Sequence, residues 1–429
     1  MPNIRLEPQQ NGFIGSDDRR LDEVSVALDR LDRWIEDQNF VGWDPHDALN
    51  SPVVRCVAGK NRLLGVAAVQ ALRRSPVNFR GLLRVPKSHN PKAMGLFLSS
   101  YSDKARVQAD AKRLSLIKFF AKWLTDHSIK GYSGPCWGYN FDWPNRGFFA
   151  PAGTPTVVNT AFVGMAFLDA EPLLKELVEE AGKESQRELD PLQVAREACD
   201  FILHDLNRHQ SNAGAICFSY TPIDQRWVHN ASLLGAQLLA AVYARTGETI
   251  LRDVSLAAAR FTASHQRSDG CWAYGIGSND QWVDNFHTGF VLVSLNEIGR
   301  SLATDEFQAA TRKGYEFWKK RMFLANGVPK YYPNKTYPID IHCVAQAILT
   351  FIQFSKADTE ALRAAHQTAL WAIDNLQDAS GFFHYQIHRW HTIRIPYMRW
   401  GQAWMQLALT KLQNARDHHE SSMEAMHAC

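Results

Sequence analysis

The sequence predicts an all-α protein, a single (α/α)6 toroid in which six outer helices surround a ring of six inner helices. Three features of the 429 residues predict it. One helix type recurs six times, an amphipathic type alternates with it, and the long aromatic-rich connections all lie at one end of the hairpins. Repeats of this length are typical of architectures in which each unit buries its apolar face against the next. An open helical solenoid is the alternative arrangement.

The recurring helix type begins with an Asn or Asp, has a Gly or Ala five residues later, and continues as an apolar run. The frame starts at Asn90, Asn159, Asn230, Asp284 and Asp340, and a sixth copy has Met398 in place of the acid or amide. Asn and Asp side chains cap helix N-termini, and a small residue one turn later lets a neighbouring helix approach closely. Apolar residues on nearly all faces indicate helices that are buried on all sides.

The alternating helices are amphipathic, with one charged face and one apolar stripe. They are predicted over 21–38, 109–127, 191–206, 252–266, 305–323 and 359–376. An extra helix over 61–74 does not fit the alternation, so the first hairpin is the least regular. We expect one domain over 21–413, between a flexible N-terminus (1–20) and a flexible C-terminal tail (414–429).

The connections that lead into the inner helices are long and rich in Gly, Trp and Tyr. They cover 131–149, 217–229, 269–287, 326–342 and 380–400, whereas the return connections are mostly short and polar. Loops positioned by a rigid scaffold commonly carry function. In a closed ring, the inner helices would all begin at this decorated rim, and the side chains there would converge on one central funnel.

Composition excludes several classes of protein. The apolar share is 45%, the charged share 21% and the net charge +3, without any block of basic residues, so no nucleic-acid partner is expected. The first twenty residues lack the apolar core of a secretory signal, and no apolar run of eighteen residues occurs, which predicts a cytoplasmic protein without membrane insertion. The seven cysteines are scattered and include no C-x-x-C pair. They indicate buried thiols rather than disulfides or a zinc site.

The predicted rim carries candidate catalytic and sugar-binding residues. Carboxylates could serve as the acid and base of glycoside hydrolysis, and Asp142 in YNFDW is the leading candidate because it has no helix to cap. Asp284 and Asp340 could instead be simple caps. Aromatic rings stack on the apolar faces of sugars, although they also pack irregular loops. The candidate binding residues are Trp137, Trp143, Asn159, His229, Asn230, Trp272, Trp282, Asn285, Tyr337, Tyr397, Arg399 and Trp400.

Histidines recur near the inner-helix starts, where they could act as acids or bases. His229, His287 and His342 each fall within three residues of such a start. A three-histidine metal site is conceivable, but a toroid spreads successive helix starts around a ring, so no metal or other cofactor is predicted. Basic residues on the same loops, Arg399 among them, suit a sugar chain that carries uronate groups.

Several strings resemble a known family of proteins. They are WDPHDALNSP (43–52), GYSGPCWGYNFDW (131–143), GTPTVVNTAF (153–162), WVDNFHTGF (282–290), KYYPNKTYPIDIH (330–342) and IPYMRWGQAWM (395–405). The family consists of bacterial and archaeal proteins of this length, often encoded beside capsule or lipopolysaccharide biosynthesis genes. Some members carry the label delta-aminolevulinic acid dehydratase. That enzyme is a β/α barrel with metal-binding cysteines, and this chain shows neither alternating strands nor clustered cysteines.

The predicted architecture also resembles the six-hairpin toroids of unsaturated glucuronyl hydrolases, polysaccharide lyases and sugar epimerases. The resemblance implies a carbohydrate-active enzyme that acts on an oligo- or polysaccharide and associates with polysaccharide-assembly enzymes. The leading hypothesis is glycosidic cleavage by Asp142 with Asp284 or Asp340. The alternative is proton abstraction from a uronate, as in a lyase or C5-epimerase, with Tyr139, His287, His342 or Tyr397 as base and acid and Arg399 holding the carboxylate. A non-catalytic glycan-binding or scaffold protein is the third possibility.

Overall fold

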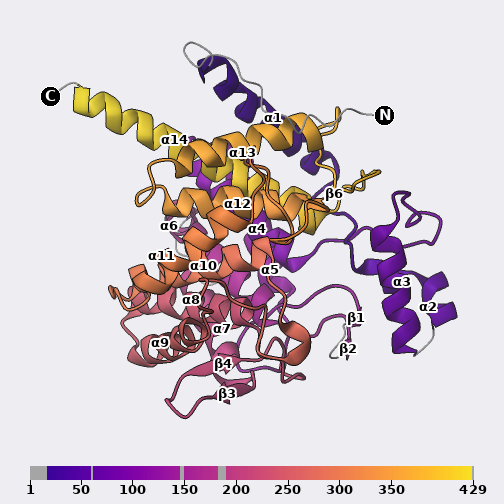
Figure 1. Ribbon diagram of the computed structural model, residues 1–429, viewed down its shortest axis with the longest axis horizontal. Helices are drawn as coiled ribbons and strands as arrows, with labels where there is room; N and C mark the ends of the chain where they lie inside the picture. Colours follow the sequence, from indigo (N-terminus) through magenta and orange to yellow (C-terminus); the bar gives the residue numbers. More distant parts are fainter. Residues whose placement is uncertain (1–16, 59–60, 145–148, 182–189, 428–429) are drawn as a thin grey trace.

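Six inner helices form a closed ring, as the sequence predicts. The computed structural model describes residues 17–58, 61–144, 149–181 and 190–427 (Figure 1). Each inner helix packs against the next, and the last packs against the first, which closes the ring and excludes the open solenoid. The inner helices are α4 (Pro91–Val107), α6 (Val157–Ala181), α8 (His229–Thr246), α10 (Asn285–Ser301), α12 (Ile341–Phe354) and α14 (Ala403–His427).

Six outer helices surround the ring. Five of them pack along the inner helix that precedes them in the chain, and the first packs against α14 and the last outer helix instead. The outer helices are α1 (Asp17–Asp37), α5 (Ala111–Asp126), α7 (Pro191–His204), α9 (Thr249–Ser264), α11 (Gln308–Arg321) and α13 (Ala361–Leu376). Helix α1 therefore includes positions 17–20, and α14 continues through 414–427, although both segments were expected to be flexible ends.

The inner helices begin close to the predicted positions, but only three begin with the predicted cap. The side chains of Asn90, Asp284 and Asp340 accept backbone N–H groups of the first turns of α4, α10 and α12. Asn159 and Asn230 lie inside the first turns of α6 and α8 and do not cap them. A short π-helix, η4 (Met398–Gln402), leads into α14 where the frame has Met398.

The small residue of the frame lies where inner helices touch. A Cβ atom at Gly95 of α4 would lie 3.4 Å from the Cα of Val163 in α6. A Cβ at Gly289 of α10 would lie 2.8 Å from the Gln346 side chain of α12. A side chain at Gly289 would have to displace Gln346, whereas a Cβ at Gly95 would just touch α6, so the small residue of the frame allows close contact between the inner helices.

The inserted segment between α1 and α4 stands beside the ring. It contains the short 3-10 helix η1 (Asp47–Asn50) and the helices α2 (Pro52–Ala58) and α3 (Arg62–Arg74). It has a small core of its own around Leu49 and Val69, separate from the main core. Figure 1 shows α2 and α3 to the right of the toroid, which explains why the predicted helix over 61–74 did not fit the alternation.

The remaining regular elements are short and belong to the connecting loops. Two antiparallel pairs are β1 (Trp143–Pro144) with β2 (Phe149–Ala150) and β3 (Arg208–Gln210) with β4 (Ile216–Phe218). A three-stranded sheet joins β5 (Ile339–Asp340), β6 (Gln386–Ile387) and β7 (Thr392–Ile393), and a short 3-10 helix, η3, covers Ser278–Asp280. The sheets hold the long loops in place above the inner-helix starts.

One described helix segment, Val157–Leu177 of α6, is long and apolar enough to cross a membrane. It is an inner helix of the ring and mostly buried there, and core helices of soluble proteins share this length and composition. The six cysteines in the described part of the chain are free, and all but Cys56 are buried.

Candidate active site

A cavity of about 190 Å³ lies at the N-terminal ends of the inner helices. All six inner helices reach it, five directly and the sixth through η4. Long loops and the inserted helix α3 complete its wall. Its lining is His46, Arg73, Lys92, Tyr139, Phe141, Trp143, Val158, Tyr220, Asn230, Tyr274, Phe286, His287, Phe290, Tyr331, His342, Arg399 and Trp400. The helix starts therefore converge on one cavity, as the sequence predicts.

His287 is held in the cavity wall by the residue that caps its helix. One oxygen of Asp284 accepts the backbone N–H of His287, and the other lies 2.7 Å from its ring Nδ1. Trp282 donates its indole N–H to the same carboxylate at 3.2 Å and stacks on Tyr274, which lines the cavity. This bonding assigns the ring proton to Nδ1 and leaves the Nε2 lone pair of His287 available.

His342 faces the cavity from the neighbouring helix α12. Its Nδ1 lies 3.1 Å from the backbone oxygen of Trp400, so Nδ1 donates, and its buried Nε2 has no protein partner. Burial lowers the pKa of His342 well below its ordinary value, and Lys92 and Arg399 lower it further. The ring is therefore neutral at physiological pH and presents a lone pair on Nε2.

Asp340 lies behind this wall. It caps α12, and it accepts the indole N–H of Trp400 at 3.0 Å and the side-chain amide of Gln386. Burial raises the pKa of Asp340. Because its oxygens are engaged with the backbone, Trp400 and Gln386, Asp340 orients the cavity wall.

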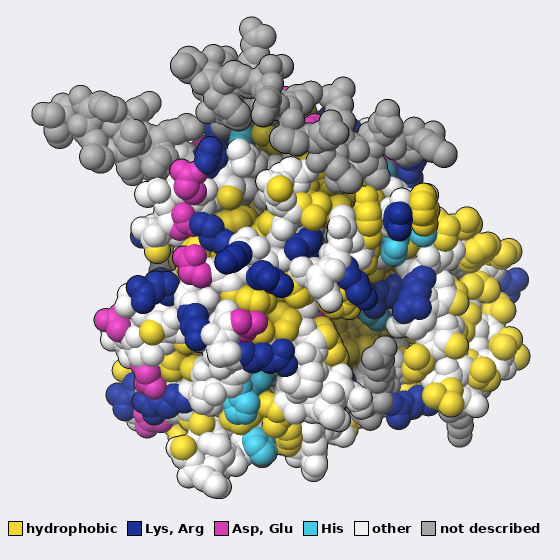
Figure 2. Space-filling model, viewed as in Figure 1, with side chains coloured by type: hydrophobic (Ala, Val, Ile, Leu, Met, Phe, Trp, Pro, Cys, Tyr) yellow, Lys and Arg dark blue, Asp and Glu magenta, His cyan; other side chains and the backbone are white. Residues whose placement is uncertain are grey.

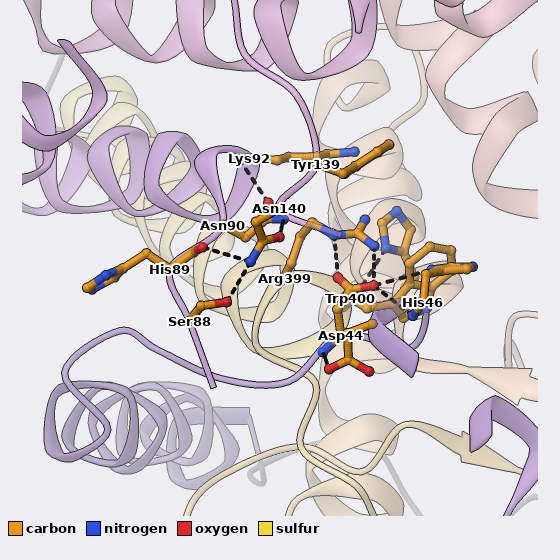
Figure 3. A network of polar contacts seen from close by, with 12 residues as sticks. Asp44, His46, Ser88, His89, Asn90, Lys92, Tyr139, Asn140, Arg399 and Trp400 are labelled. Carbon is orange, nitrogen blue, oxygen red and sulfur yellow. Dashed lines mark hydrogen bonds and ion pairs between the residues drawn. The ribbon is translucent and has the colours of Figure 1, made fainter. Parts of the chain in front are cut away.

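Three cationic side chains face the cavity. Arg399 forms a two-bonded ion pair with Asp44, at 2.6 and 2.8 Å, and lies over the ring of Tyr139 (Figure 3). Arg73 donates to the hydroxyl of Tyr385 at 2.8 Å and lies over Trp400. None of the described carboxylates lines the cavity, so its walls favour an anionic ligand.

Lys92 is the most unusual of the three. It is 4% exposed, and its Nζ lies 4.3 Å from the ring centre of Phe162 and 5.1 Å from that of Trp404. Its amine forms no ion pair among the described residues. Burial lowers the pKa of Lys92 well below its ordinary value, and Arg399 adds to the effect. An anion in the cavity would supply the missing countercharge.

A hydrogen-bond network fixes the loop that carries Tyr139 and Phe141. Asn140 between them donates to Ser88 at 2.6 Å and to the backbone oxygen of His89, and accepts from Asn90, the cap of α4 (Figure 3). The hydroxyl groups of Tyr139 and Tyr220 lie 3.0 Å apart. Burial raises the pKa of Tyr139, which keeps it a neutral hydrogen-bonding group.

The structure brings some of the predicted site residues together and separates others. Those that line the cavity are Tyr139, Trp143, Asn230, His287, His342, Arg399 and Trp400. Several others support the fold. Trp137 and Trp272 donate to backbone oxygens of their own hairpins, and Asn285 bonds to Met322 and Trp318. Asn159 is fully buried in the core, Tyr397 packs under Arg80, and Tyr337 is partly buried before β5.

Asp142 does not line the cavity, contrary to the prediction. Its carboxylate pairs with Arg55 of α2 at 3.2 Å and accepts the backbone N–H of Ala152 at 2.8 Å. The partner comes from the inserted segment, which the repeat pattern does not position. With Asp284 and Asp340 behind the wall, the expected pair of carboxylates facing a substrate is not formed at this cavity.

His229 also lies away from the cavity. It begins α8 and packs against Phe261 of the outer helix α9 and His265, the residue that follows that helix. Burial lowers the pKa of His229 to about 3. The imidazole of His229 points away from the centre of the toroid. His229 comes one residue before Asn230, which is the position that faces the cavity.

Sequence reasoning missed part of the lining, although the repeat frame could have located it. Lys92 lies two residues after the cap of α4, as His342 lies two residues after the cap of α12. Tyr220, Tyr274 and Tyr331 lie in the predicted rim loops. His46 and Arg73 belong to the inserted segment, and His46 lies in WDPHDALNSP, one of the strings that resemble the known family, although no role was predicted for it.

A larger cavity, of about 1130 Å³, opens at the opposite end of the ring. Phe290 lines both cavities, so one layer of aromatic side chains separates them. Four acidic residues line this larger cavity, of which Asp103 and Glu297 pair with Lys411 and Arg300 and Asp169 accepts a hydrogen bond from Ser99. The histidines and the unpaired lysine lie in the smaller cavity, which we take as the candidate active site. The described residues include no group of His, Cys, Asp or Glu arranged to bind a metal.

The fold is that of an (α/α)6 toroid, and it is shared with carbohydrate-active enzymes. Cellobiose 2-epimerase from Bacillus thermoamylovorans superposes with a TM-score of 0.61 and 12% identity, over 78% of this chain and 90% of that one. An unsaturated glucuronyl hydrolase specific for heparin gives 0.60 and 12%, over 94% and 98%. The GH76 α-mannanase of Bacteroides thetaiotaomicron gives 0.57 and 12%, over 78% and 89%. No family model and no curated protein sequence matches the chain.

Proposed function

We propose that this protein is a sugar epimerase that moves a carbon-bound proton on an acidic saccharide. One observation carries the proposal. Two imidazoles from adjacent inner helices, His287 and His342, line the cavity with Nδ1 engaged, and no hydrogen bond from the described residues occupies Nε2 of either. One imidazole, neutral, can remove a proton next to a carboxylate or carbonyl group, and the second, if it starts the cycle protonated on Nε2 as well, can deliver that proton to the opposite face of the same carbon.

The charges around the cavity suit the same chemistry. Removal of the proton places negative charge on the carboxylate or carbonyl oxygens of the sugar. Arg73, Lys92 and Arg399 line the cavity and would stabilise that charge, and the lining contributed by the described part of the chain includes no acidic side chain to oppose it. The aromatic lining, including Trp143 and Trp400, suits the apolar face of a sugar ring.

Glycosidic cleavage by paired carboxylates has less support. The mechanism needs two carboxyl groups facing the substrate, and Asp284 and Asp340 are both engaged with other side chains behind the wall. The superposed enzymes include epimerases and hydrolases, so the fold by itself does not decide between the two reactions.

The test is solvent exchange. The protein would be incubated in deuterium oxide with uronate-containing oligosaccharides and with neutral reducing sugars, and the products examined by NMR and mass spectrometry. We expect one carbon-bound deuterium per turnover in an acidic saccharide. His287→Gln and His342→Gln should abolish exchange, and His229→Gln, outside the cavity, should retain it.

Three outcomes would contradict the proposal. New reducing ends that carry solvent oxygen, without deuterium at carbon, would indicate hydrolysis. An unsaturated product that absorbs in the ultraviolet would indicate a lyase. Saccharide binding without any turnover would indicate a glycan-binding protein.

A further inference from the structure

The inserted segment exposes an unusual share of apolar side chains. Half of the large hydrophobic residues that are exposed in the described chain lie within positions 53–82, on α2, α3 and the loop after them. They are Val53, Val57, Leu63, Leu64, Val77, Phe79 and Leu82, and we call this set the insertion patch. Figure 2 shows hydrophobic side chains gathered over this part of the surface, on the right of the view. Soluble proteins rarely expose contiguous patches of this kind without a partner.

Helix α3 has the form of a helix that lies on a surface. Gly65 and Val69 face the small core of the insertion, while Leu63, Ala67 and Ala71 are exposed at spacings of four residues. The exposed stripe is therefore apolar along its whole length and ends at the exposed Arg74. A helix that is apolar on its outer face and basic at its edge is typical of binding to a lipid interface.

The charge of the inserted segment indicates which kind of partner the insertion patch would bind. From position 48 to position 102 the sequence contains nine Lys and Arg residues and no Asp or Glu. Arg80 and Arg55 are paired with Asp47 and Asp142, which lie outside that interval. Arg74 and Arg84 are exposed and form no ion pair among the described residues. A surface that is apolar and basic without acidic residues complements an anionic bilayer.

We propose that the insertion patch binds the surface of a membrane containing anionic lipids, without crossing it. A second copy of the chain fits less well, because a symmetric pair would bring the basic residues of both copies together. A nucleic acid also fits less well, because exposed aliphatic side chains offer nothing to phosphates or bases.

The patch and the candidate active site share one helix. Leu63 and Arg73 lie near opposite ends of α3, about 15 Å apart along the helix axis, and Arg73 lines the cavity. A saccharide attached to a lipid could therefore reach the cavity while its lipid stays in the bilayer. This substrate class, a lipid-linked acidic saccharide, rests on the proposed function, whereas membrane binding by the patch does not.

The test is co-sedimentation of the full chain with vesicles of phosphatidylcholine alone and of phosphatidylcholine mixed with phosphatidylglycerol. We expect binding to the mixed vesicles that weakens as salt is added. Leu63→Asp with Leu82→Asp should reduce the bound fraction about tenfold. The matched control is Ile223→Asp with Ile250→Asp, which changes two exposed aliphatic side chains outside the insertion and should bind normally.

A second measurement uses the exposed Cys56 of α2. An environment-sensitive fluorophore on Cys56, with Cys429 replaced by Ser, should shift its emission when mixed vesicles are added. Arg74→Glu with Arg84→Glu should remove that shift and leave the melting temperature unchanged. These readouts need no turnover, so they remain valid if the proposed reaction is wrong.

Three results would overturn membrane binding by the patch. One is an absence of vesicle binding, and another is equal binding to both kinds of vesicle. The third is a concentration-dependent dimer that Leu63→Asp dissociates, which would assign the patch to a protein partner.

Discussion

The ring Nδ1 of His287 lies 2.7 Å from a carboxylate oxygen of Asp284, and the other oxygen of that carboxylate caps helix α10. One side chain therefore starts the helix and also sets the tautomer of the histidine that faces the cavity. The two duties can be separated by mutation, because asparagine caps helices as well as aspartate does.

Asp284→Asn should keep the fold and lose the chemistry. The asparagine oxygen can still cap α10, so the free energy of unfolding should change by no more than about 1 kcal/mol. Its amide would donate to Nδ1 of His287 and move the ring proton to Nε2. We expect the turnover number to fall by about two orders of magnitude or more. Thermal unfolding and the exchange assay would measure the two effects, and full activity in a stable variant would return Asp284 to a purely structural role.

Lys92→Met should stabilise the protein and inactivate it. Methionine fills a similar volume among Phe162, Phe290 and Trp404 and removes a buried amine that lacks a countercharge. We expect the free energy of unfolding at neutral pH to rise by about 1–3 kcal/mol. The gain should shrink as the pH approaches 10.5, the ordinary pKa of lysine, because the unfolded wild-type side chain then also loses its proton.

A destabilised Lys92→Met variant would contradict this interpretation and indicate that the three aromatic rings hold a charged amine favourably. Lys104→Met is a useful comparison, because Lys104 is partly buried and is paired with Asp32. That change should destabilise the protein by leaving a carboxylate without its partner.

Stability should fall as the pH drops below about 6.5, partly through His229. Burial lowers the pKa of His229 from 6.5 to about 3. Between these values the unfolded state binds the proton and the folded state does not, so acid favours unfolding. His46, with its pKa lowered to about 4 by burial, acts in the same direction. Thermal unfolding of His229→Leu between pH 7 and about pH 4 should show a smaller loss than wild type, with normal turnover, and an equal loss would contradict the assignment.

Arg73→Gln should weaken the binding of acidic substrates selectively. Arg73 lines the cavity from the inserted helix α3 and makes no ion pair among the described residues. We expect the KM for a uronate-bearing saccharide to rise about tenfold, with little change for a neutral analogue. Kinetics with the matched pair of substrates would measure it, and equal losses for both would indicate that Arg73 only supports the wall.

The repeat frame predicted the ring because each inner helix meets the same local requirements. Asn90, Asp284 and Asp340 each satisfy the exposed N–H groups of a first turn, and the glycine after each of Asn90 and Asp284 fits a close helix contact. The frame predicted the wrong capping residue where another side chain accepts the N–H groups of the first turn. The Thr156 hydroxyl accepts the N–H of Asn159 at the start of α6, so Asn159 became a core residue.

The site was harder to predict because its partners come from segments that the repeat does not position. Asp142 and Arg399 form ion pairs with Arg55 and Asp44, which lie in the inserted segment between α1 and α4. The frame alone could not show that Asp142 would be neutralised there. Lys92 was not predicted because no sequence motif marks a functional lysine inside an apolar helix. The one indication is that Lys92 and His342 each lie two residues after the residue that caps their helix.

The ring of inner helices can close only after nearly the whole chain has been synthesised, because the first inner helix packs against the last. Asp44 and Arg399 are 355 positions apart in the chain, and the backbone beside them pairs Trp43 with Tyr397. A ribosome releases the first of these residues long before the last, so the earlier hairpins can collapse while the cavity still lacks a wall. Until α14 packs against α4, the growing chain exposes the apolar faces of α4 and α12, the two inner helices that α14 contacts. The binding site is incomplete until then. The nascent protein therefore gains its ligand-binding capacity in one late step and depends until then on protection from aggregation.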